Sequence, residues 1–142
     1  MRIAVISCSL NPSSRSFILA GKAVELLETR KVETGLYDLR TYGLDFCGIP
    51  SARENQAVSE LKTVIEEASA ILLAVPIYNF DVNAAAKNLI ELTGRSWTSK
   101  LVGFMCAAGG RASYMSVMGI ANSLMLDFRC LIVPRFVYAP SD

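Results

Sequence analysis

The chain has 142 residues, of which 52% are hydrophobic, and we predict that residues 1–142 form a single domain with one sizeable core. The formal net charge is +1, and the sequence has no Lys/Arg-rich run, which argues against nucleic acid or an anionic membrane as a partner. No apolar run approaches the roughly 18 residues that a membrane span needs. The sequence has no histidine, which excludes a Ser-His-Asp triad, a Cys-His pair and a histidine-ligated metal within this chain.

Strand and helix signals alternate in the first half of the chain. Residues 2–7 are a continuous β-rich apolar run, and 9–14 form a turn and helix-start cluster. Apolar residues recur at helical spacing over 16–28, and 31–39 indicates a second, weaker strand. Residues 41–52 are rich in glycine and proline signals and predict a loop.

The alternation continues through the middle of the chain. Residues 54–67 carry apolar side chains on one helical face, and 71–75 form a short, wholly apolar strand. We predict an irregular segment over 76–82. Residues 83–93 are helical in composition, and Gly94 fits the end of that helix.

The last third of the chain predicts a fourth strand over 101–107, a fourth helix over 113–127 and a fifth strand over 131–138 that is interrupted at Pro134. The resulting βαβαβαβαβ order predicts a parallel sheet with right-handed crossovers and helices on both faces. No helix signal follows the fifth strand. We therefore expect either a chain that ends early or a partner subunit over the uncovered part of the sheet.

The cysteines carry little functional signal. Cys8, Cys47, Cys106 and Cys130 form no CxxC pair, which argues against a zinc or redox-dithiol site, and we predict no metal site. Cys8 and Cys106 lie in apolar runs and are expected to be buried. Free thiols and an N-terminus without a signal-peptide pattern predict a cytoplasmic protein.

Three loops are expected at the carboxyl edge of the sheet, where ligands bind in open α/β folds. The first is rich in hydroxyl groups, and its candidate ligand-binding residues are Ser9, Asn11, Ser14, Arg15 and Ser16. A helix N-terminus with hydroxyls and one arginine is a natural phosphate site. The alternative is that the serines only cap the helix. Neither GxxxxGK[ST] nor GxGxxG is present, so a single monophosphate fits this loop better than a pyrophosphate.

The second loop contains an aromatic residue beside an amide, just after a buried strand. Its candidate residues are Pro76, Ile77, Tyr78 and Asn79. Tyr78 suits a contact with a flat ligand, while an ordinary turn with a half-buried tyrosine is the alternative.

The third loop combines two glycines with a cation. Its candidate residues are Ala108, Gly109, Gly110 and Arg111. The glycines allow a close approach of the backbone to a ligand, and the arginine would stabilise negative charge. A flexible strand-to-helix turn is the alternative.

Together these motifs resemble the NAD(P)H-dependent FMN reductase family of the flavodoxin superfamily, over essentially the whole chain. The resemblance rests on Ser9 with residues 13–16, on the P-x-Y-N element at 76–79 followed by Lys87 and Asn88, and on residues 109–110. The similarity is greatest to the flavin reductases that supply alkanesulfonate monooxygenases. Two places depart from the family pattern: Cys8-Ser9-Leu10-Asn11 replaces Gly-Ser-x-Arg, and Asn83-Ala84 replaces Pro-Gly.

The resemblance implies a flavodoxin-like, doubly wound, five-stranded parallel sheet of order 2-1-3-4-5, here lacking the last helix. It implies FMN as cofactor, with the first loop on its phosphate, the second beside its ring and the third at the pyrimidine side. NADPH or NADH would be the electron donor and a small molecule the substrate. The expected reaction is hydride transfer from the nicotinamide to flavin N5 and onward transfer to an acceptor, without a catalytic side chain.

Other functions fit the same fold. A flavodoxin-type electron carrier would bind FMN without oxidising NAD(P)H, but such carriers are usually strongly acidic and have a Thr/Gly-rich phosphate loop. An interaction domain that has lost its flavin is a further alternative. Quinone, azo-dye and metal-ion reductases share the flavin site and differ in the acceptor pocket.

The fourth predicted helix is apolar on several sides. Met115, Met118 and Met125 lie along one side of it, and Ile120 and Leu124 lie on another. A helix of this kind is buried, and together with the family resemblance it predicts a homodimer or homotetramer with the flavin near the interface. The alternative is a core helix in which methionine fills space.

Overall fold

The computed structural model describes residues 1–141. The apolar run at the N-terminus forms β1 (Arg2–Ser7), which lies between two parallel strands of the sheet. The other strands are β2 (Glu33–Asp38), β3 (Ala70–Tyr78), β4 (Asp81–Val82), β5 (Leu101–Ala108), β6 (Leu131–Ile132) and β7 (Val137–Pro140). The main path runs β2-β1-β3-β5-β6, with β7 also parallel to β5. Counted as five predicted strands, this is the expected 2-1-3-4-5 order, which is confirmed.

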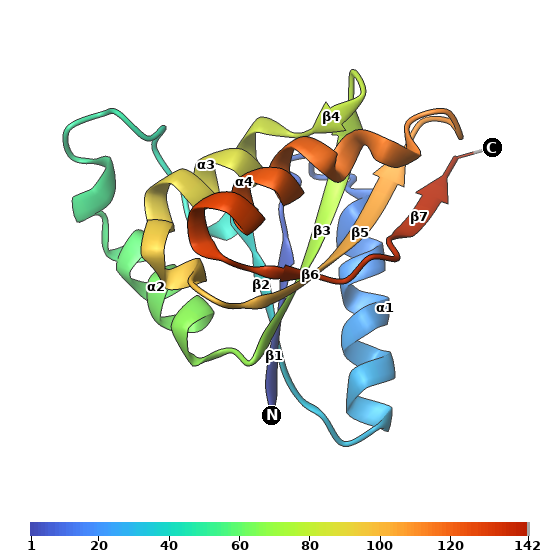
Figure 1. Ribbon diagram of the computed structural model, residues 1–142, viewed down its shortest axis with the longest axis horizontal. Coiled ribbons are helices and arrows are strands. Elements are labelled where there is room, and N and C mark those ends of the chain that lie inside the picture. The colour runs from blue at the N-terminus through green and yellow to red at the C-terminus, as the bar shows by residue number, and fades with distance from the viewer. Residues whose placement is uncertain (142) are drawn as a thin grey trace.

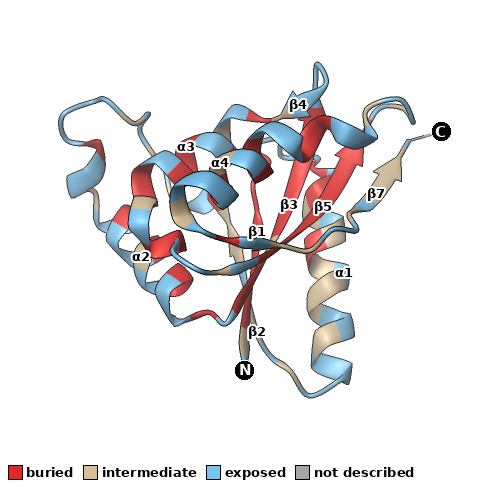
Figure 2. Ribbon diagram, in the orientation of Figure 1, coloured by how far each residue is buried: buried red, intermediate tan, exposed pale blue. Residues whose placement is uncertain are grey.

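Helices cover both faces of the sheet, as predicted (Figure 1). They are α1 (Arg15–Thr29), α2 (Gln56–Glu67), α3 (Ala84–Thr93) and α4 (Met118–Phe128). On one face, α1 packs over a small core that includes Val5, Ala74 and Met105. On the other, α2, α3 and α4 enclose the larger core around Trp97 and Phe104. Both layers bury the central strands, which Figure 2 shows in red along β3 and β5.

The predicted fifth strand forms as two short pieces, β6 and β7, with a break that contains Pro134. Proline has no backbone N–H to donate to the ladder, so the strand is interrupted there. Within residues 1–141 no helix follows β7. None of the helices in this part of the chain is long and apolar enough to cross a membrane.

The prediction of an irregular segment over 76–82 is wrong. Strand β3 continues to Tyr78 and pairs with β4 in an antiparallel hairpin. The two turn residues, Asn79 and Phe80, have φ values of 52° and 62°, as in the type I′ turns that match the twist of a hairpin. Asparagine tolerates this conformation, whereas phenylalanine rarely adopts it, so residues 79–80 carry no clear turn signal.

Two other boundaries differ from the prediction. The fourth helix begins with a short 3-10 segment, η4 (Tyr114–Val117), before α4. The predicted loop over 41–52 overlaps 3-10 turns at both ends, η1 (Leu39–Thr41) and η2 (Ala52–Glu54). A third 3-10 turn, η3 (Gly94–Trp97), follows α3. Gly94 ends α3 with a φ of 49°, which confirms its predicted role.

Candidate functional site

The start of α1 is built from serine side chains. Ser14 is the N-cap residue, and its Oγ accepts a hydrogen bond from the Phe17 N–H at 3.0 Å. The hydroxyls of Ser14 and Ser16 are 2.9 Å apart and share one hydrogen bond. The cap satisfies one of the first-turn donors, while the N–H groups of Arg15 and Ser16 have no acceptor within the helix. Capping and ligand binding are therefore compatible in this loop, rather than alternatives.

The loop before α1 is held by its own side chains. Ser9 Oγ accepts a hydrogen bond from the Asn11 N–H at 3.2 Å, and Asn11 Oδ1 accepts one from the Ser13 N–H at 2.9 Å. Ser9 is 1% exposed. The hydroxyl of Ser9 accepts in this turn, so its own proton is free to donate to a ligand. The Asn11 side chain is used inside the loop.

A cavity of about 250 Å³ lies where the three predicted loops meet. Nine of the thirteen candidate residues line it: Ser9, Asn11, Ser14, Arg15, Ser16, Pro76, Ile77, Tyr78 and Gly109. Two further residues, Ser13 and Ala107, complete the lining. Ser13 lies inside the predicted serine cluster. Ala107 ends the predicted fourth strand and directly precedes Ala108, the first candidate residue of the third predicted loop.

Arg15 connects two of the three loops. Its guanidinium Nη2 donates a hydrogen bond to the carbonyl oxygen of Ala108 at 3.0 Å, from the start of α1 to the end of β5. This bond keeps a positive charge at the edge of the cavity. Ala108 itself is buried and contributes its carbonyl group to Arg15 rather than a surface to the cavity.

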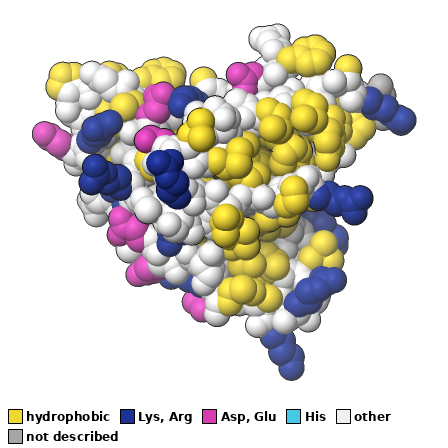
Figure 3. Space-filling view, in the orientation of Figure 1, with side chains coloured by type: hydrophobic (Ala, Val, Ile, Leu, Met, Phe, Trp, Pro, Cys, Tyr) yellow, Lys and Arg dark blue, Asp and Glu magenta, His cyan; other side chains and the backbone are white. Residues whose placement is uncertain are grey.

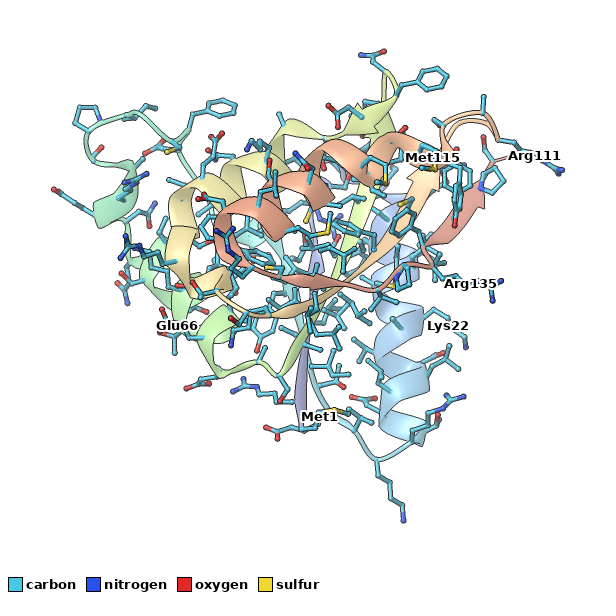
Figure 4. All side chains as sticks on the ribbon, viewed as in Figure 1. Met1, Lys22, Glu66, Arg111, Met115 and Arg135 are labelled. Atoms are coloured by element: carbon cyan, nitrogen blue, oxygen red, sulfur yellow. The ribbon has the colours of Figure 1, made fainter. Side chains whose placement is uncertain are left out.

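The remaining candidates lie beside the cavity and do not line it. Asn79 is exposed at the tip of the β3–β4 hairpin. The carbonyl of Gly110 accepts a hydrogen bond from the Tyr138 hydroxyl at 2.5 Å, which ties its loop to β7. Arg111 extends outward from that loop (Figure 4). The third loop therefore contributes Gly109 to the cavity itself.

The cysteines near the site are protonated at neutral pH. Burial raises the pKa of the Cys8 thiol strongly and that of Cys106 to about 11. A buried thiol is a poor nucleophile because the thiolate is the reactive form. In the described part of the chain, no group of three or more Cys, Asp or Glu side chains is arranged to hold a metal ion.

A second, larger cavity of about 590 Å³ lies on the other side of the first loop. Its lining is mainly apolar and comprises Leu10, Pro12, Leu39, Arg40, Gly43, Leu44, Phe46, Ala84, Ala85 and Asn88. These residues come from three separate segments, 10–12, 39–46 and 84–88, and no shared sequence pattern groups them as a site.

Comparison with known proteins gives a consistent family. A sequence model of the family described as NADPH-dependent FMN reductase matches residues 1–142. An NAD(P)H-dependent FAD/FMN reductase of Geobacillus thermodenitrificans (strain NG80-2) is 25% identical over 114 residues, which cover 79% of this chain and 62% of that protein. An NADPH azoreductase of Bacillus sp. (strain OY1-2) is 22% identical over 138 residues, which cover 96% of this chain and 75% of that protein. The chain thus spans less than two thirds of the first of these relatives.

Solved structures share the fold. The apo form of the NADH:FMN oxidoreductase EmoB superposes with a TM-score of 0.81 at 17% identity, covering 98% of this chain and 75% of EmoB. The flavoenzyme NAD(P)H:acceptor oxidoreductase FerB from Paracoccus denitrificans superposes with a TM-score of 0.80 at 23% identity, covering 96% of this chain and 78% of FerB. At these identities the structures establish the flavodoxin-like architecture.

Proposed function

Because the chain belongs to the NADPH-dependent FMN reductase family, we propose that it binds FMN at the first loop, reduces it with NADPH or NADH and passes the electrons to a small-molecule acceptor. The observation that carries this proposal is the cavity at the start of α1, where buried hydroxyls and one guanidinium surround a space without any acidic lining residue among those described.

The residues present fit the phosphate of FMN. Ser9 has a free hydroxyl proton, and the Ser14–Ser16 pair has a second one once its internal hydrogen bond is made. The N–H groups of Arg15 and Ser16 add the partial positive charge of a helix N-terminus. The Arg15 side chain adds a full charge at the rim. This donor set suits an anion with several acceptor oxygens.

The size of the cavity limits what it can enclose. Its volume of about 250 Å³ is below the roughly 300–1,000 Å³ of sites that enclose a whole drug-sized ligand. We therefore propose that it takes the phosphate end of FMN, while the ring lies outside it against Tyr78 and Gly109. Tyr78 is 51% exposed, so its ring is free to contact a flat ligand.

When bound, FMN supplies the redox chemistry by accepting a hydride at N5 and returning electrons to an acceptor. The residues of this chain bind and orient it. The thiols of Cys8 and Cys106 are protonated, so we assign no side chain a role as acid, base or nucleophile.

The class of electron acceptor is proposed from the names of two relatives. One relative is named an NADPH azoreductase and another an FAD/FMN reductase, and on this ground we propose azo compounds or free flavin as the acceptors to test first. A flavodoxin-type electron carrier remains the alternative to an enzyme.

The proposal is tested by the absorbance spectrum of the protein with FMN under anaerobic conditions, before and after NADH or NADPH. We expect the flavin absorbance band at about 450 nm to bleach when the protein is present at a catalytic concentration, far below that of FMN. Binding of FMN without bleaching would instead support the electron carrier. Absence of FMN binding would reject both.

We also propose a homodimer or homotetramer that contacts a second copy through α4. The exposed side chains of Met115, Met118 and Met125 form part of an apolar band over α4, β6 and β7 (Figure 3). Sedimentation velocity over a dilution series tests this, with Met118→Lys expected to dissociate the assembly because it places a charge in the contact. A wild-type protein that is monomeric at all concentrations would contradict it.

A further inference from the structure

Asn83 lies immediately before α3 and is 7% exposed. It occupies the N-cap position, yet its side chain does not cap the helix. Instead, its Nδ2 donates a hydrogen bond to the carbonyl oxygen of Cys8 at 2.7 Å, across 75 positions of sequence. The side chain therefore links the start of α3 to the loop that begins the phosphate site.

The orientation of the Asn83 amide is fixed by this contact. Turning the amide over would bring Oδ1 against the Cys8 carbonyl oxygen, and two acceptors at that distance repel each other. In the orientation observed, Oδ1 is buried without a hydrogen-bond partner within residues 1–141. Burying an unpaired acceptor is unfavourable, so this orientation of Asn83 lowers the stability of the folded protein while it keeps the bond to Cys8.

The bond also sets the direction of the next backbone donor. In a planar trans peptide, the N–H of Ser9 points opposite to the C=O of Cys8. With that carbonyl held toward Asn83, the Ser9 N–H points away from Asn83. Ser9 lines the phosphate cavity and is 1% exposed, and its N–H has no acceptor among the described residues. Buried N–H groups without an acceptor are rare in proteins.

We propose that Asn83 is a positioning residue for the phosphate of FMN, which holds the Cys8–Ser9 peptide so that the Ser9 N–H donates to that phosphate. This inference rests on the proposed function, since it needs FMN at the first loop. It also links two places where the sequence departs from its family pattern, at Cys8 and at Asn83. Through their hydrogen bond, α3 contributes to a site that it does not line.

The first test compares FMN with riboflavin, which lacks the phosphate, by titration of flavin fluorescence. For Asn83→Ala we expect FMN to bind about 10- to 100-fold more weakly, the effect of one lost bond to a charged group, and riboflavin to change less than about twofold. Asn88→Ala is the matched control. Asn88 is also buried on α3, but it bonds to Cys47 and Asp45, so its loss should leave the FMN-to-riboflavin ratio unchanged.

A second variant separates positioning from general destabilisation. In Asn83→Asp the ionised carboxylate cannot donate to Cys8, whereas the protonated carboxyl can. We expect the FMN-to-riboflavin ratio of this variant to approach that of wild type as the pH falls, with the wild-type ratio at each pH as reference. Repulsion between the carboxylate and the phosphate would give the same recovery, so the positioning role requires in addition that the uncharged Asn83→Ala variant binds FMN selectively more weakly.

A third measurement needs no variant. In 1H–15N spectra of the wild-type protein, FMN should shift the Ser9 amide proton downfield, as expected for a new bond to an anion, and riboflavin should not. Equal shifts with both flavins, or equal ratios for Asn83→Ala and Asn88→Ala, would overturn the inference. Failure of the wild-type protein to bind FMN would instead reject the proposed function.

Discussion

The two cavities on either side of the first loop differ in how far their polar groups are already hydrogen-bonded within the protein. Alternate residues of one short segment face in opposite directions: Ser9 and Asn11 line the smaller cavity, and Leu10 and Pro12 line the larger one. The smaller cavity presents hydroxyl and backbone donors that have no acceptor among residues 1–141. The larger cavity is mainly apolar.

The polar side chains of the larger cavity already have hydrogen-bond or ion-pair partners within the protein. Asn88 accepts a hydrogen bond from the Cys47 N–H at 2.8 Å and donates to the Asp45 carbonyl at 3.0 Å. The guanidinium of Arg40 pairs with Asp38, at 2.8 Å from Nε to Oδ2, and lies 4.4 Å from the ring centre of Phe17.

The comparison shows how size and chemistry can disagree. The largest apolar pocket is the usual first hypothesis for a ligand site, yet the lining of the larger cavity contains no hydroxyl side chain, whereas four serines line the smaller one. These hydroxyl donors, rather than volume, are therefore our reason for proposing the smaller cavity as the phosphate site.

The strongest way to break this comparison is to place a carboxylate in each cavity. Ser16 and Ala85 are both the second residue of their helices, so Ser16→Asp and Ala85→Asp are matched in helix position. A charge near the phosphate costs up to about 4 kcal/mol at close range, and we expect Ser16→Asp to weaken FMN binding about 100-fold. Ala85→Asp should leave FMN affinity within about twofold, since its carboxylate enters the other cavity.

Riboflavin titration is the control for both carboxylate variants. Its affinity should change less than about threefold in Ser16→Asp, because riboflavin has no phosphate to repel. A larger loss of FMN affinity in Ala85→Asp than in Ser16→Asp would mean that the phosphate occupies the apolar cavity, and the assignment of the two cavities would be reversed.

A smaller effect is expected from removing the cap of α1. Ser14→Ala loses the bonds to Phe17 and Ser16, so the free energy of unfolding should fall by about 1 kcal/mol and FMN should bind about tenfold more weakly. Urea denaturation and fluorescence titration measure the two effects. Asn55→Ala removes the corresponding cap of α2, where Asn55 Oδ1 accepts from the Ala57 N–H at 2.9 Å. It should lower stability equally without any change in FMN affinity.

Much of the fold could be predicted because the signals are local. Buried parallel strands such as β1 and β5 are continuous apolar runs, and Gly94 marks the end of α3. Short connections between alternating strands and helices then fix a parallel sheet. The meeting of the three loops followed from the same rule, because the carboxyl ends of parallel strands lie at one edge.

What could not be predicted depends on contacts between distant residues or on backbone conformation. The hairpin at Asn79 and Phe80 was missed because a phenylalanine at positive φ is not a turn signal. The bond from Asn83 to the Cys8 carbonyl joins residues 75 positions apart, and no local pattern in the sequence indicates it. Arg40 likewise reaches the carbonyls of Asn11 and Pro12 from the 3-10 turn η1, and no spacing in the sequence indicates this contact.

The ion pair of Asp38 and Arg40 offers the mildest test of the comparison. Arg40 Nη1 donates to the Pro12 carbonyl at 3.0 Å, so it supports the first loop from the side of the apolar cavity. In Asp38→Asn the guanidinium of Arg40 keeps its hydrogen bond to the Pro12 carbonyl and its contact with the ring of Phe17. We therefore expect FMN affinity to fall only about twofold, as for a residue that acts through the loop rather than on the phosphate.

The same substitution should change the pH dependence of stability. Partial burial acts to raise the pKa of Asp38, but the hydrogen bonds and charge of Arg40 outweigh it and hold that pKa below its ordinary value. The stabilisation from a lowered carboxyl pKa is complete above the unfolded value of about 3.9 and is lost as the pH falls through the folded value. Urea denaturation should therefore find wild type more stable than Asp38→Asn at pH 6, with the difference shrinking below about pH 4. Equal stability of the two proteins at pH 6 would mean that Phe17 and Pro12 hold Arg40 without help from the carboxylate.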